Sequence, residues 1–255
     1  VKYGVTYVPD AGYAPGLTNV LAGKLFREGY ERIGIYVGGL PLDGWETMLH
    51  AVTFNVEGLI DEYVRPARLV SEGSVGSVDP LEIIKRVKFK GAEFEAFYSD
   101  GLRTLLRTLK TKELFELTFR YSGHLELMKR LRDMGFFSLE KIGSTSPRKM
   151  TERLLSVVRC KRDMCLTCVE GRDRRVKRYV CVDKWDGRNG LSSMGRMTGF
   201  SAYAMARIVL DGGLETGVRP PEFFGMIEGH LERYLTLLRK KGIEVEEEYA
   251  DTVLA

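Results

Sequence analysis

The stretch Val5-Thr-Tyr-Val-Pro-Asp10-Ala-Gly12-Tyr-Ala-Pro15-Gly16-Leu-Thr-Asn19 changes its pattern twice within a short span. A β-rich run over residues 4–8 ends at Pro9 and Asp10, and a helical pattern follows through Leu21 and Leu25. A strand, a tight polar turn and a helix in that order place backbone N–H groups and a carboxylate at the carboxyl end of the strand. Open α/β sheets bind ligands at that end. Pro15 suits the first turn of a helix, where its missing N–H is not needed. An ordinary βα turn punctuated by proline and glycine explains the stretch equally well.

The composition is that of a globular protein. The chain has 255 residues, of which 44% are hydrophobic and 29% charged, enough for one large domain or two smaller ones. No apolar run approaches the roughly 18–20 residues that cross a bilayer, and the N-terminus lacks the pattern of a signal peptide. We therefore expect a cytoplasmic protein with no membrane partner. The net charge of +4, with both signs interspersed, suits small anionic ligands and predicts no nucleic-acid partner.

The periodicities predict an α/β (α+β) fold with a mixed or antiparallel sheet, because strands lie between helical ends with few βαβ crossovers. We expect strands at 32–37, 67–70, 83–89, 94–98, 114–121, 164–169 and 179–183. The turn-rich, basic segment Gly171–Lys177 is expected to join the last two strands as a hairpin. The Ala/Met-rich helix Phe200–Leu210 is expected to be buried nearly all round. One long helix is expected from Pro220 to about Lys241.

The four cysteines are candidate metal ligands. Cys160-x4-Cys165-x2-Cys168, followed by Cys181, begins with iron–sulfur-like spacing, and zinc is also conceivable. Cys165 and Cys168, however, lie in a predicted strand, where residues three apart point to opposite faces. We therefore predict no metal site and favour buried structural thiols, with a disulfide or a metal as the alternatives.

Polar residues stand at strand-to-helix turns in three places. Besides Asp10, they are Tyr98-Ser99-Asp100-Gly101 and Thr118-Phe-Arg120-Tyr121-Ser-Gly123-His124. Helix N-termini favour anions and an arginine fork binds a carboxylate well, so these turns are candidates to line one cleft. Helix capping by Asp100 and His124, with Arg120 a surface charge, is the simpler alternative.

Several stretches resemble the saccharopine dehydrogenase-like family, and most closely its lysine 6-dehydrogenase type. The matching residues run in order from about Tyr3 to about Gly242. They are Val8-Pro-Asp-Ala-Gly-Tyr-Ala-Pro-Gly-Leu-Thr-Asn19, Gly38-Gly-Leu-Pro41, Phe54-Asn-Val-Glu-Gly-Leu-Ile-Asp-Glu-Tyr63, Glu95-Ala-Phe-Tyr-Ser-Asp-Gly101, Thr118-Phe-Arg-Tyr-Ser-Gly-His124 and Ser193-Met-Gly-Arg-Met-Thr-Gly-Phe200. The segment 160–177 matches least, so the resemblance adds nothing about the cysteines.

The resemblance implies a domain organisation. Residues 1–33 would end a Rossmann-like dinucleotide-binding domain, 34–192 would form the catalytic, substrate and dimerisation domain, and 193–255 would return as helices to the Rossmann domain. The glycine fingerprint G-x-G-x-x-G does not occur in this sequence. Because numbering starts at Val1 rather than at Met, we expect it to open partway through a longer protein.

The resemblance also implies NAD- or NADP-dependent oxidation of a C–N bond, with an amino acid such as lysine or saccharopine as substrate. The catalytic candidates are Asp10 and Asp100 at the amine end and His124 as proton carrier. The substrate-binding candidates are Tyr98, Gly101, Thr118, Arg120 and Tyr121, with Arg120 on the substrate carboxylate. The cofactor-binding candidates are Gly12, Ala14 and Pro15.

Three alternatives remain open. One is a saccharopine or carboxynorspermidine type reductase from the same family. Another is a non-catalytic binding or dimerisation module, which applies if no nucleotide domain precedes Val1. The third is a cysteine-metal protein. The resemblance implies a homodimer or homotetramer.

Overall fold

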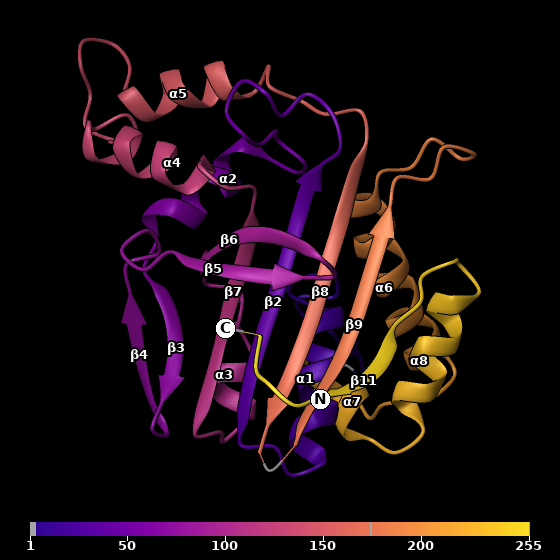
Figure 1. The fold of residues 1–255 in the computed structure, drawn as a ribbon. Coiled ribbons are helices and arrows are strands. Elements are labelled where there is room, and N and C mark those ends of the chain that lie inside the picture. The colour runs from indigo at the N-terminus through magenta and orange to yellow at the C-terminus, as the bar shows by residue number, and fades with distance from the viewer. Residues whose placement is uncertain (1–3, 174, 255) are drawn as a thin grey trace.

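The fold is built around a mixed sheet, seen in a computed structural model that describes residues 4–173 and 175–254 (Figure 1). Val1 and Tyr3, where the numbering and the resemblance begin, lie outside the described residues. Within those residues, nine strands join in the order β11-β9-β8-β2-β7-β3-β4, with β6 also on β7 and β5 on β6. β2 runs parallel to β7, while the other pairs in this sheet are antiparallel. The predicted mixed sheet is confirmed.

The strands of this sheet are β2 (Arg32–Pro41), β3 (Ala67–Ser71), β4 (Ser74–Val78), β5 (Lys85–Phe89), β6 (Ala92–Tyr98), β7 (Glu113–Arg120), β8 (Asp163–Arg172), β9 (Val176–Lys184) and β11 (Glu246–Ala250). The helices are α1 (Leu17–Arg27), α2 (Val56–Val64), α3 (Leu105–Thr108), α4 (His124–Asp133), α5 (Pro147–Leu155), α6 (Ser193–Leu210), α7 (Glu222–Met226) and α8 (His230–Arg239). Two short strands, β1 (Thr6–Tyr7) and β10 (Gly217–Val218), form a separate parallel pair.

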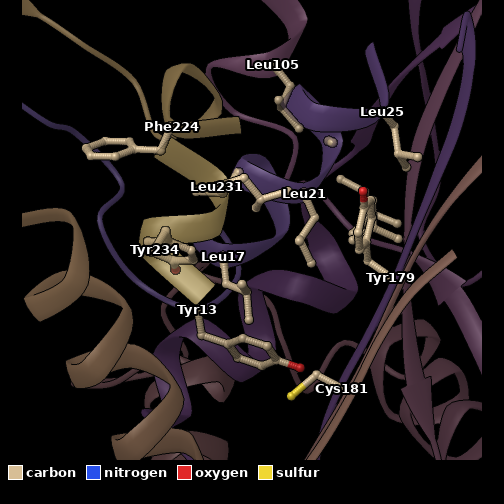
Figure 2. Packing of buried hydrophobic residues seen from close by; sticks show 14 of the residues in the cluster. Tyr13, Leu17, Leu21, Leu25, Leu105, Tyr179, Cys181, Phe224, Leu231 and Tyr234 are labelled. Carbon is tan, nitrogen blue, oxygen red and sulfur yellow. The ribbon is translucent and has the colours of Figure 1, made fainter. Parts of the chain in front are cut away.

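Three apolar cores hold these layers together. Helices α1, α6, α7 and α8 cover one face of the sheet, the β5–β6 hairpin crosses the other, and α2, α4 and α5 form a lobe beside the carboxyl end of β2 (Figure 1). Leu17, Leu21 and Leu25 recur at helical spacing along α1 and are fully buried, each contributing about 1.5–3 kcal/mol. Figure 2 shows Leu17 and Leu21 between Tyr179 of β9 and Tyr234 of α8, with Leu231 of α8 next to Leu21.

Helix α1 crosses α7 at unusually short range because both helices carry a glycine at the contact. A Cβ on Gly225 would lie 2.6 Å from the Lys24 amide nitrogen and closer still to the Val20 carbonyl oxygen. A Cβ on Gly23 would lie 2.9 Å from the carbonyl carbon of Glu222. The crossing therefore joins the beginning and the end of the described chain with no room for a side chain between them.

The prediction of one long C-terminal helix is wrong, because the structure has two helices, α7 and α8, in its place. The chain leaves helical geometry at Ile227, and Gly229 has φ 75°, so two helices replace one. The apolar spacing continues across this break and therefore did not reveal it.

Two further differences concern β8, β9 and α6. The predicted hairpin is confirmed, since β8 and β9 pair as antiparallel neighbours, but its turn is shorter than Gly171–Lys177 because β8 reaches Arg172 and β9 starts at Val176. Helix α6 begins earlier than predicted, at Ser193, where the Ser192 hydroxyl accepts a hydrogen bond from the Gly195 amide. It is buried along one face only, and Tyr203 and Leu210 are exposed.

The four cysteines are free thiols in the structure. Cys165 belongs to the core under the helices and Cys168 to the core on the opposite face, as their spacing on a strand predicted. Burial raises the pKa of Cys181 to about 12, so its thiol stays protonated at neutral pH.

Candidate functional site

A cavity of about 460 Å³ opens at the carboxyl ends of the parallel strands β2 and β7. Six residues singled out from the sequence line it: Asp10, Gly12, Ala14, Pro15, Thr118 and Arg120. The rest of the wall includes Tyr13, Gly38, Gly39, Phe54, Glu62, Glu116, Met194 and Thr198. The cavity therefore lies at the sheet edge where open α/β sheets bind ligands.

The turn after β1 builds one wall of the cavity from backbone. Asp10 adopts a left-handed conformation, φ 53°, and Gly16 packs so closely on Gly12 that a Cβ would overlap the Gly12 backbone. The Ala14–Pro15 peptide bond is cis, and helix α1 begins at Leu17. Pro15 therefore precedes the helix instead of lying in its first turn. The wall presents few side-chain atoms, so a ligand can approach the main chain.

Arg120 lies at the end of β7, with about 1% of its surface exposed. Its Nε donates to the hydroxyl of Tyr63 at 2.9 Å, Nη1 donates to the Phe119 carbonyl at 2.9 Å, and Nη2 donates to Glu62. The guanidinium also lies over the ring of Phe97. These contacts use one N–H on each nitrogen, which leaves one N–H on Nη1 and one on Nη2 for another acceptor. Arg120 is thus a fixed cation in the cavity wall.

Behind Arg120, the buried His124 accepts from the Tyr63 hydroxyl through Nε2 at 2.8 Å. Its Nδ1 lies 2.7 Å from the Met48 carbonyl, which only accepts, so the network assigns the ring proton to Nδ1. Burial, and secondly the charge of Arg120, lower the pKa of His124 to about 3. His50 packs beside it, with ring centroids 4.9 Å apart. His124 does not line the cavity, and Tyr63 and Arg120 separate it from the wall.

We expect His124 to remain neutral throughout the ordinary pH range. A folded-state pKa near 3 below an unfolded-state value near 6.5 means that the unfolded chain binds more protons between those limits. His124 therefore reduces stability as the pH falls from about 6.5 towards 3. Imidazole ¹⁵N chemical shifts followed from pH 8 to 4 should stay constant for His124. A His124 titration between pH 5 and 7 contradicts this assignment.

Glu116 is the second buried ionisable group in the wall, only 4% exposed in the middle of β7. The Ser99 hydroxyl donates to Oε1 at 2.8 Å and lies 2.7 Å from the Thr118 hydroxyl. Oε2 is buried without a hydrogen-bond partner among the described residues. Burial raises the pKa of Glu116 to about 7, and the charges of Glu62 and Asp100 add to this rise. The hydrogen bond from Ser99 and the nearby backbone N–H of Gly101 oppose it.

At its mouth the cavity adjoins a second hollow of about 440 Å³, which shares Asp10, Glu62 and Glu116 with the first. Asp100 and Gly101 also line it. Arg68 holds the Asp100 carboxylate through two side-chain bonds of 2.7 and 2.9 Å. Arg103 lies 3.7 Å from Asp10. Carboxylates from separate elements therefore meet at the mouth.

The structure thus brings together most, but not all, of the predicted site residues. Tyr98 and Tyr121 line neither cavity: the Tyr121 hydroxyl donates to the Pro41 carbonyl, and the Tyr98 ring packs on Phe115. Gly101 has a steric role, because a Cβ there would overlap the Glu116 carboxylate.

Sequence reasoning missed Glu62, Tyr63 and Glu116. Glu116 had a usable signal, since it is the charged residue inside an otherwise apolar run, Leu114–Phe119. Glu62 and Tyr63 stood within a quoted stretch, but nothing in the pattern of α2 indicates that they contact Arg120.

Among the residues that the structure describes, no three His, Cys, Asp or Glu side chains are grouped so that they could hold a metal ion. No helix in residues 4–173 and 175–254 is long and apolar enough to cross a membrane.

The chain is similar to known proteins both in sequence and in fold. A family model described as the saccharopine dehydrogenase C-terminal domain matches residues 12–243. Saccharopine dehydrogenase (L-Glu forming) from Saccharomyces cerevisiae matches with TM-score 0.79 and 18% identity, over 98% of this chain and 75% of that one. Homospermidine synthase from Legionella pneumophila, solved in complex with NAD, matches with TM-score 0.61 and 12% identity, over 98% of this chain and 64% of that one. At these identities the two structures show a shared fold.

Proposed function

Since the chain belongs to the saccharopine dehydrogenase C-terminal domain family, we propose that it serves NAD(P)-dependent oxidation of the C–N bond of an amino acid. The family resemblance predicted from short motifs is confirmed. The observation that carries the proposal is the fixed, buried guanidinium of Arg120 in a cavity whose other charged groups are carboxylates. The reaction would be of the lysine 6-dehydrogenase or saccharopine dehydrogenase type. Association into a homodimer or homotetramer and a cytoplasmic location stay predictions.

The charges of the cavity complement a substrate with a carboxylate and an amine. The remaining N–H groups on Nη1 and Nη2 of Arg120 would receive the substrate carboxylate as a two-pronged pair. The amine would lie towards Asp10 and Asp100 at the acidic mouth. Because Arg68 already holds Asp100, we propose that Asp100 acts on the amine through its charge, while Asp10 approaches it directly.

The residues present fit the reactive end of a nicotinamide cofactor. Gly12, Ala14 and Pro15 form an uncharged part of the cavity wall, against which the nicotinamide ring would lie. A phosphate-binding glycine fingerprint does not occur in the sequence, so this chain's proposed contribution is to the ring and not to the phosphates. When bound, the cofactor supplies a hydride acceptor.

For a primary amine, the proposed reaction is an oxidation followed by a hydrolysis. The substrate ammonium loses a proton, and the C–H bond beside the nitrogen breaks as a hydride leaves with both electrons, which gives an iminium ion. Water then adds to the iminium carbon, and the C–N bond breaks to give an aldehyde and ammonium. The protein must therefore hold both ends of the substrate and accept the proton from the amine.

The test is turnover by the full protein with lysine or saccharopine and either NAD or NADP, followed through reduction of the nicotinamide. We expect lysine with NAD to be the active pair, and saccharopine turnover would assign the saccharopine type instead. The variant Arg120→Lys keeps the charge but loses the fork, so KM for the amino acid should rise about 10-fold or more. An unchanged KM would remove Arg120 from carboxylate binding. Absence of turnover with every pair would overturn the enzyme proposal.

A further inference from the structure

We propose that Glu116 is the catalytic residue that accepts the proton from the substrate amine, an inference that rests on the proposed function. The geometry that supports it is independent of the family comparison. Glu116 is buried in the wall of the cavity, and its Oε2 has no hydrogen-bond partner among the described residues. A buried carboxylate oxygen without a partner is costly unless a ligand completes it.

The surroundings of Glu116 fix its orientation. Ser99 has one hydroxyl proton and gives it to Oε1, so the proton between Ser99 and Thr118 comes from Thr118. Thr118, Ser99 and Glu116 therefore form a chain in which every donor points towards the carboxylate. Because Gly101 has no side chain, there is room beside it for the Glu116 carboxylate. With Oε1 held in this way, Oε2 is the atom left to meet a ligand.

Glu116 suits proton exchange better than the other acidic or basic groups near the cavity. Both ring nitrogens of His124 are engaged, and the ring lies behind Tyr63. Glu62 is paired with Arg120, and Asp100 with Arg68. The Asp10 carboxylate is less buried than that of Glu116 and lies 3.7 Å from the Arg103 guanidinium. A carboxyl group that titrates near neutral pH is suited to take up and return a proton at the operating pH.

The step is a proton transfer from the substrate ammonium nitrogen to Oε2 of ionised Glu116. The N–H bond breaks, its electron pair stays on nitrogen, and an O–H bond forms on the carboxyl group. The lone pair freed on nitrogen is what allows the neighbouring C–H bond to break, and a bound nicotinamide would accept that hydride. The same carboxyl group returns the proton to solvent, which restores its charge for the next turnover.

The variant Glu116→Gln keeps the shape and the acceptor for Ser99 but cannot take up a proton. We expect kcat to fall by about 10²–10⁴-fold while the dissociation constant for lysine changes little. The matched control is Glu95→Gln on the neighbouring strand β6. Glu95 also has a buried, unpartnered Oε2 but does not line the cavity, so this variant should keep its kcat. A Glu116→Gln enzyme with unchanged kcat would overturn the role.

Carboxyl titration without substrate separates this inference from the proposed function. In protein labelled with ¹³C at glutamate carboxyl carbons, one signal should titrate near pH 7 and vanish in Glu116→Gln but not in Glu95→Gln. Titration of Glu116 near 4.5 would overturn the inference even in an active enzyme. A Glu116 signal near pH 7 in a protein that turns over no amine would instead place the failure in the proposed function.

Discussion

The variant Arg120→Ala is expected to lower the free energy of unfolding by about 2–4 kcal/mol, because it removes a buried cation and its hydrogen bonds, although its partner Glu62 is partly exposed. The loss leaves Glu62 without its cation and leaves the Phe119 carbonyl and the Tyr63 hydroxyl without their donor. Burial already raises the pKa of Glu62 above its usual value, and Arg120 is the group that opposes this rise. Chemical denaturation at pH 7 measures the change.

Arg130→Ala is the matched control for this prediction. Arg130 donates to Glu126 at 2.9 Å on the surface of α4, where both side chains are more than half exposed. An exposed pair of this kind contributes about 0.3–0.5 kcal/mol. Equal losses in the two variants would mean that the Arg120 pair is no more important to the fold than a surface pair.

The variant Gly225→Ala is expected to cost about 3 kcal/mol or more, because its Cβ would collide with the backbone of α1. Backbone atoms cannot turn away as a side chain can, so α7 must move off α1. Alanine has the higher helix propensity by about 1 kcal/mol, so propensity alone predicts the opposite sign. The midpoint of urea unfolding, measured with an unchanged slope, decides between the two effects.

Gly199→Ala provides the control, since Gly199 lies inside α6 and a Cβ there meets nothing within 4 Å. This variant should gain about 0.5–1 kcal/mol from propensity. Gly23→Ala, on the other side of the crossing, should lose stability as Gly225→Ala does. A neutral Gly225→Ala would show that the two helices do not approach each other as closely as described.

The mixed sheet was predictable because strand-like runs lay between helical ends without the regular crossovers of a parallel sheet. The break between α7 and α8 was not, because Phe224, Leu231 and Leu238 keep a helical spacing across it. Apolar spacing reports which side chains face a core, and two short helices on the same core satisfy it as well as one long helix.

Site residues whose positions are set by a turn at a strand end could be predicted from the sequence. Those whose positions depend on packing between distant elements could not. Asp10 follows β1, Arg120 is the last residue of β7, and both line the cavity, so their positions at strand ends indicated the site. His124 stands only four residues beyond Arg120, yet it is buried behind the wall, since the first turn of α4 points it towards Tyr63. Which side of a helix start faces a cavity depends on neighbouring elements, and the local sequence does not record it.

The crossing of α1 with α7 has a consequence for synthesis on the ribosome. Helix α1 ends at Arg27, and its partner α7 begins at Glu222, so about 200 residues separate the two. At roughly 5–20 residues per second, α7 emerges on the order of 10–40 s after α1. During that interval the leucines of α1 have no α7 or α8 to cover them. The sheet strands that emerge earlier can cover only part of the apolar face of α1, so this core closes only after residues 222–239 have been synthesised.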